Sequence, residues 1–193
     1  MTMVTLVLGL MFSTAWAEAT FFNVPKINPL VSITKIEIVE LEPKLKAEVK
    51  INRIKNTNAF LNDIGLRESS NRYKIVNQYG YLGKYQFSRK TLNDIGFKHV
   101  SNREFLSTPQ IQEEAMRILL EKNRFNLRHQ IKKYDGKIVN GVLVTESGIL
   151  AAAHLAGVGN VKEWFKNGKE FRDGNGTKLT SYLKTFAGYK LDF

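Results

Sequence analysis

Cysteine is absent from the 193 residues of the sequence. Disulfides, thiol nucleophiles and cysteine-ligated zinc are therefore excluded. Histidine is also scarce, with three residues and no pair at metal-ligand spacing. The G-x-S-x-G motif of a serine nucleophile is missing as well. These absences predict that the protein holds no metal and uses no thiol or serine-elbow chemistry.

Acidic residues are few relative to basic ones. Asp and Glu total 18 against 29 Lys and Arg, which gives a formal net charge of +11 and a pI of about 9.8. A surface of this charge attracts polyanions, which include nucleic acid, anionic membranes and acidic cell-wall polymers.

A long apolar run is also missing from the start of the chain. The stretch "VTLVLGLMF" is too short to span a bilayer comfortably. Ala15 and Ala17 follow it in "STAWA", the small-x-small pattern that a signal peptidase cleaves, here after Ala17. Residues 1–17 are therefore predicted to be a signal peptide, which implies export to the periplasm or secretion. No Lys or Arg precedes the run, and a buried N-terminal helix is the alternative.

Residues 18–56 differ in pattern from the rest and are predicted to be an N-terminal arm or linker. The two prolines of "NVPKINPL" favour extended backbone. Ile36 and Ile38 begin a partial period-two alternation, which is consistent with one or two edge strands or with an irregular arm.

From Thr57 onward apolar residues recur at helical spacing, and 57–193 is predicted to be one domain. Phe60 and Ile64 lie on one face of a helix that leads to Glu68. The most apolar helix, "ESGILAAAHLA" after a Thr145 cap, is expected to be central and buried. The remaining helices are expected after the caps Ser88 and Ser101, from Pro109 toward Lys133, around Val161–Phe165 and around Ser181–Phe186. The predicted fold class is mainly α, with six or seven short helices around the buried one and an extended N-terminal arm.

The segment after Glu68, "SSNRYKIVNQYGYLGKYQF", is rich in residues that suit a carbohydrate cleft. It holds four tyrosines for stacking on sugar rings, and Asn77 and Gln86 to bond hydroxyl and acetamido groups. Gly80 and Gly83 allow the backbone to approach a ligand. A carboxyl group among such rings would be desolvated, which raises its pKa as a general acid requires. A solvated Glu68 beside a packed loop is the alternative.

The ordered motifs resemble those of the lytic transglycosylases and goose-type lysozymes, which share a lysozyme-like fold. The family signature is a helix ending in "ES", a glycine-containing loop, and "GLMQ" or "G-x-x-Q"; this chain has Glu68-Ser69, then Gly80, then Gly83 to Gln86. The family's later "AYNAG" corresponds to "AHLAG" from Ala153. The resemblance covers roughly residues 57–190.

The resemblance implies a role for each matching position. Glu68 would be the catalytic acid and base, Ser69 would orient it or bind sugar, and Tyr85 and Gln86 would line the cleft. His154 stands where the family has tyrosine and is either near Glu68 or a satisfied core histidine. Leu155 replaces an asparagine and offers no polar contact. The implied activity is cleavage of the bond between N-acetylmuramic acid and N-acetylglucosamine in peptidoglycan, giving 1,6-anhydro products without a metal or organic cofactor.

Three other functions are compatible with the sequence. A hydrolase on the same fold would need a second carboxylate, for which Asp94 and Glu146 are candidates. A catalytically weak peptidoglycan-binding module is the second. A nucleic-acid binder is disfavoured because the aromatic residues cluster after Glu68 rather than alternating with Lys and Arg. The expected partner is the glycan strand, and a monomer is expected.

A second glycine-containing stretch, "DGNGTKL" from Asp173, has part of the pattern of a calcium-binding loop. The twelfth position holds Lys184 where such a loop requires Glu. The stretch is therefore predicted to be a turn.

Overall fold

The computed structural model describes residues 55–193. The predictions for the signal peptide and for almost all of the N-terminal arm lie outside these described residues. The described residues form one compact unit.

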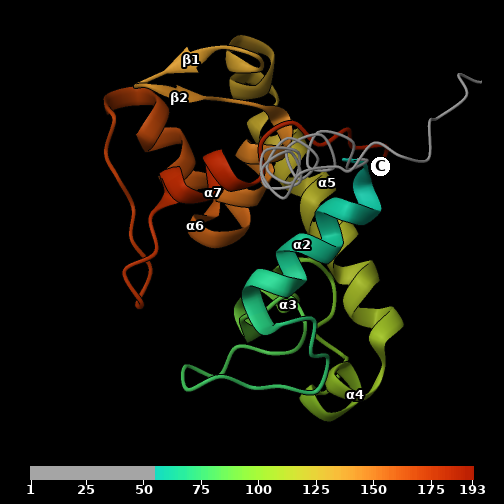
Figure 1. The fold of residues 1–193 in the computed structure, drawn as a ribbon. Helices are drawn as coiled ribbons and strands as arrows, with labels where there is room; N and C mark the ends of the chain where they lie inside the picture. Colours follow the sequence, from blue (N-terminus) through green and yellow to red (C-terminus); the bar gives the residue numbers. More distant parts are fainter. Residues whose placement is uncertain (1–54) are drawn as a thin grey trace, which may run out of the picture. The chain divides into compact units, whose positions relative to one another are not determined.

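The described part of the chain is mainly helical, as predicted (Figure 1). It contains six helices and one antiparallel hairpin of two short strands. In chain order these are α2 (Thr57–Ser69), α3 (Arg89–Asp94), α4 (Asn102–Ser107), α5 (Pro109–Tyr134), β1 (Ile138–Val139), β2 (Val142–Leu143), α6 (Glu146–Asn167) and α7 (Leu179–Thr185).

The predicted caps fix where three of these helices begin. Ser88, Ser101 and Thr145 each accept a hydrogen bond from the backbone N–H three residues later, at 3.0, 3.2 and 3.2 Å. Such a bond satisfies one of the backbone donors that a helix start leaves free. Pro109 is the first residue of α5, where its missing N–H has no consequence.

Helix α6 is the buried central helix that the sequence predicts. Residues 147–153 are all buried, and α6 packs against both α5 and α7. Gly148 allows α7 to approach closely, because a Cβ built there would lie 2.6 Å from the carbonyl oxygen of Leu183 on α7. The helix kinks at Gly157, where φ is 78° and ψ is 156°. The separate short helix expected around 161–165 is therefore the second half of α6.

Two further features differ from the sequence-based expectation. Helix α5 has 26 residues, as the helix expected from Pro109 toward Lys133 implied, and α6 has 22, so the description of short helices around a buried one does not hold for the whole domain. The hairpin was not predicted either, although Asn140 and Gly141 carry its turn with φ of 50° and 73°. An Asn-Gly pair between apolar residues is a strong local hairpin signal.

The apolar face of helix α2 packs against the core, and this packing sets the position of Glu68. Phe60 is fully buried and makes edge contacts with the rings of Phe186 at 5.9 Å and Tyr189 at 5.4 Å. The helix ends at Ser69, and the next residue, Ser70, adopts a left-handed conformation with φ of 56°. Glu68 consequently lies in the last turn of a helix that is held by the core.

Candidate functional site

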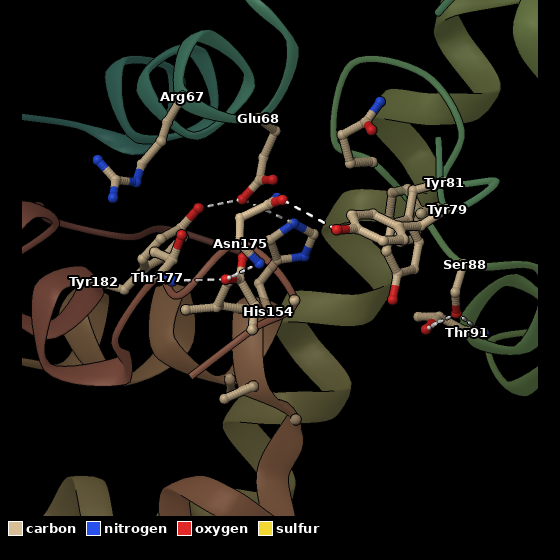
Figure 2. Close-up of a pocket in the computed structure, with 18 of the residues that line it drawn as sticks. Arg67, Glu68, Tyr79, Tyr81, Ser88, Thr91, His154, Asn175, Thr177 and Tyr182 are labelled. Atoms are coloured by element: carbon tan, nitrogen blue, oxygen red, sulfur yellow. Dashed lines mark hydrogen bonds and ion pairs between the residues drawn. The ribbon is translucent and has the colours of Figure 1, made fainter. Parts of the chain in front are cut away.

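A pocket of about 570 Å³ contains Glu68 in its wall (Figure 2). One wall comes from the end of α2 and the loop that follows it, residues 77–88. The opposite wall comes from α6 at residues 153–157, from the turn at residues 173–177, and from Tyr182 of α7. The site is therefore built by chain segments about a hundred residues apart in sequence.

The Glu68 side chain is 16% exposed and accepts a hydrogen bond from the Tyr182 hydroxyl, with 2.5 Å between the oxygens. Tyr182 is itself buried, at 2% exposure. Burial and the negative charge of Glu68 both raise the pKa of Tyr182, so the phenol stays protonated and remains a donor. One oxygen of the Glu68 carboxyl group is thereby held in a defined position.

His154 lies on the other side of Glu68. Its Nε2 is 3.9 Å from Glu68 Oε1, which is too long for a hydrogen bond. Its Nδ1 is buried and has no hydrogen-bond partner among the described residues. Burial lowers the pKa of His154, against the opposing effects of the Glu68 charge and the Tyr85 backbone. The imidazole is therefore neutral at neutral pH, and it is at once a core side chain and a neighbour of Glu68.

Two of the predicted sugar-binding residues, Asn77 and Gln86, line the pocket. The Asn77 Oδ1 accepts hydrogen bonds from the backbone N–H groups of Tyr79 and Tyr81, at 2.9 and 3.0 Å. This arrangement presents the two tyrosines at 52% and 40% exposure, with flat faces available to a ligand. Gln86 has a φ of 50° and donates to the Gly83 carbonyl at 2.8 Å.

Three predicted substrate-binding residues, Ser69, Gly83 and Tyr85, lie outside the pocket lining. Ser69 is buried and donates to the Lys84 carbonyl at 2.8 Å. Tyr85 is fully buried and donates to Glu113 at 2.6 Å. These side chains hold the loop against the core and do not line the pocket.

Gly83 has a structural role, because a side chain at this position would collide with a buried glutamine. A Cβ built on it would lie 2.1 Å from Oε1 of Gln112, and its φ is 71°. The Gln112 amide in turn accepts from the Lys84 N–H at 2.8 Å and donates to the carbonyl of Tyr73 at 2.9 Å. Gly83 therefore lets a buried glutamine bind the backbone of the loop that follows Glu68.

The turn predicted at Asp173 is present, but its place in the pocket was not predicted. The Asp173 carboxylate accepts hydrogen bonds from the N–H groups of Asn175 and Thr177, at 3.0 and 2.6 Å. The Asn175 Oδ1 accepts from the Tyr79 hydroxyl at 3.3 Å, so the two walls touch (Figure 2). No local sequence signal indicates this contact between residues 96 positions apart.

The two carboxylates considered as partners for Glu68 lie outside the pocket. Asp94 pairs with Lys90 at 2.5 Å, and Glu146 at the start of α6 pairs with Arg124 at 2.7 Å. Asp173 is the other carboxylate in the lining.

Among residues 55–193 no three metal-ligating side chains gather into a possible metal site. No helix in this part of the chain combines the length and apolar character that crossing a membrane requires. Comparison with family models, curated proteins and solved structures finds no match to this chain.

Proposed function

We propose that this chain is a peptidoglycan lytic transglycosylase with a lysozyme-like fold, in which Glu68 is the general acid and base. The observation that carries the proposal is the hydrogen bond from Tyr182 to Glu68 inside a pocket walled by tyrosines and amides. The order of the motifs around Glu68, Gln86 and His154 supports the same family.

The pocket suits a short stretch of glycan. Its volume of about 570 Å³ falls within the usual range of ligand sites. Tyr79 and Tyr81 offer faces for sugar rings, while Asn77, Gln86 and Asn175 offer amides for hydroxyl and acetamido groups.

The proposed reaction needs one carboxyl group. Protonated Glu68 gives its proton to the glycosidic oxygen while the bond from that oxygen to C1 of the muramoyl residue breaks, and N-acetylglucosamine leaves with a free hydroxyl. The carbonyl oxygen of the substrate's own acetamido group bonds to C1 and stabilises the positive charge. The C6 hydroxyl then attacks C1, the acetamido oxygen leaves, and Glu68 takes the hydroxyl proton. The product is a 1,6-anhydro ring, and Glu68 is protonated again.

The test is digestion of purified sacculi with the full chain, followed by mass spectrometry of released muropeptides. Wild type should release 1,6-anhydromuropeptides, and Glu68→Gln should lower the rate by about 10²- to 10⁴-fold, the usual contribution of a general acid. Glu146→Gln changes a glutamate outside the pocket and is the matched control. Normal turnover by a folded Glu68→Gln variant would refute the assignment.

A hydrolytic muramidase is the second candidate, and Asp173 is the observation that favours it. A hydrolase needs a carboxylate that activates water, and Asp173 lines the same pocket as Glu68. The Asp173 carboxylate is, however, engaged by two backbone N–H groups of its own turn. Products with reducing ends, together with loss of activity in a folded Asp173→Asn variant, would establish the hydrolase instead.

A further inference from the structure

Arg67 is the only lysine or arginine among residues 55–193 that lines the pocket. It directly precedes Glu68 in the last turn of α2. Figure 2 shows the two side chains leaving the helix side by side, with the guanidinium group turned away from the Glu68 carboxylate.

The guanidinium group is held in place by α7. Its carbon lies 4.8 Å from the centre of the Tyr182 ring, and Nη2 donates to the Ser181 hydroxyl at 3.3 Å. A stacked and hydrogen-bonded arginine has already lost part of its rotamer freedom, which lowers the entropic cost of binding a ligand.

No ion pair among residues 55–193 neutralises the charge of Arg67. The other carboxylate of the lining, Asp173, is directed to its own backbone. A fixed cation at a pocket, with most of its five N–H donors still available, matches the planar geometry of a carboxylate.

We propose that Arg67 binds a carboxylate carried by the muramoyl residue of the substrate. This inference rests on the proposed function and adds a preference for anionic glycan. Two sources supply that carboxylate: the lactyl group, which is free on a bare glycan strand, and the attached stem peptide. N-acetylglucosamine carries neither.

The test measures affinity by titration calorimetry in the full chain carrying Glu68→Gln, so that ligands are not cleaved. The three ligands are chitotetraose, an alternating tetrasaccharide of N-acetylglucosamine and N-acetylmuramic acid with free lactyl groups, and the same tetrasaccharide with stem peptides. Arg67→Gln and Arg67→Lys are compared with Lys184→Gln, which removes an equal charge from α7 outside the pocket.

We expect Arg67→Gln to lower the affinity for one or both anionic ligands about tenfold relative to the affinity for chitotetraose, because one charge-assisted pair is lost. Arg67→Lys should keep part of the preference, because it retains the charge but loses the planar fork. Lys184→Gln should leave the preference unchanged. The anionic ligand that loses affinity identifies the source of the carboxylate.

An equal loss of affinity for all three ligands would mean that Arg67 acts only through the Tyr182 ring, and this result would overturn the inference. Unchanged affinities in Arg67→Gln would overturn it as well. Both results leave the proposed reaction intact. If the chain with Glu68→Gln binds none of the saccharides, the proposed function fails together with this inference. If it binds them with the expected preference but wild type cleaves nothing, only the catalytic proposal fails.

Discussion

The loop that carries Gln86 rests on a buried polar network, and Glu113 of α5 is its centre. The Lys84 Nζ lies 2.7 Å from Glu113 Oε1, and the lysine side chain is only 9% exposed. The hydroxyl groups of Tyr73 and Tyr85 also donate to this carboxylate, at 2.7 and 2.6 Å. Lysine is almost never buried unless its charge is paired, so we expect the network to be sensitive to loss of either charge.

Replacing Glu113 by Ala leaves the buried Lys84 charge without its counter-charge and two tyrosine hydroxyls without their acceptor. Removing one partner of a buried pair costs about 3–5 kcal/mol, and the 31% exposure of the Glu113 side chain places this case toward the lower limit. Glu113→Gln keeps one carbonyl oxygen and should cost about 2–3 kcal/mol. With about 2–4 °C per kcal/mol for a chain of this size, the melting temperature should fall by about 4–12 °C in Glu113→Gln.

The assay is urea unfolding followed by circular dichroism, with thermal melts alongside. Asp94→Asn is the matched control, because it breaks a pair with Lys90 whose lysine side chain is 84% exposed. The double variant Lys84→Met/Glu113→Leu removes both charges and should recover part of the stability lost in Glu113→Ala, because no buried charge is left unpaired although the Tyr85 hydroxyl still lacks its acceptor. If Glu113→Gln and Asp94→Asn have the same melting temperature, the network does not hold the loop as described. The same follows if the double variant is less stable than Glu113→Ala.

The same network makes the free energy of unfolding depend on pH in the acidic range. Burial raises the pKa of Glu113, but hydrogen bonds from Lys84, Tyr85 and Tyr73, together with the Lys84 charge, outweigh it and lower the pKa below its ordinary 4.5. A carboxylate with a lowered folded-state pKa contributes stability above the unfolded pKa and loses it as the pH falls through the folded value. Unfolding free energies measured from pH 6 downward should therefore decline less steeply below pH 4.5 in Glu113→Gln than in wild type.

Four other substitutions have defined outcomes. Tyr182→Phe keeps the buried ring but removes the donor to Glu68, so muropeptide release should fall about ten- to hundredfold with little change in melting temperature. Gly157→Ala places a Cβ in a backbone conformation that only glycine tolerates, and it should lower the free energy of unfolding in urea by about 1–3 kcal/mol. Gly159→Ala changes an ordinary helical position of α6 and should be neutral or stabilising. The pKa of His154 is lowered in the folded protein, so stability should fall as the pH drops below 6.5, by at most about 1.4 kcal/mol per pH unit. His154→Phe should flatten that decline.

Features set by neighbouring residues could be predicted from the sequence. Ser88, Ser101 and Thr145 cap helices because a side-chain oxygen reaches an N–H only three residues away. The burial of α6 follows from its nearly unbroken apolar composition. The position of Glu68 at the end of α2 follows from the apolar face that Phe60 begins.

Features set by contacts between distant segments could not be predicted in this way. Tyr85 and Gln86 are adjacent, yet the first is fully buried against Glu113 while the second lines the pocket. The sequence shows both as polar residues of one loop. Gln86 adopts a left-handed backbone with φ of 50° in the turn that begins at Gly83, and no glycine stands at position 86 to indicate this. The burial of Lys84 depends on a carboxylate 29 positions away.

Tyr182 is the most consequential residue that sequence reasoning did not single out, and the reason is physical. The residue is 2% exposed, and its ring lies 5.2 Å from the ring of Phe186. It therefore has the features of an ordinary core residue in a short helix. Its hydroxyl nevertheless reaches Glu68, 114 positions earlier in the chain. A buried tyrosine combines an apolar body with a polar tip that must find a partner. Once a carboxyl group is suspected of proton transfer, the aromatic residues of later buried helices are therefore the first candidates for the donor that positions it, even where no motif includes them.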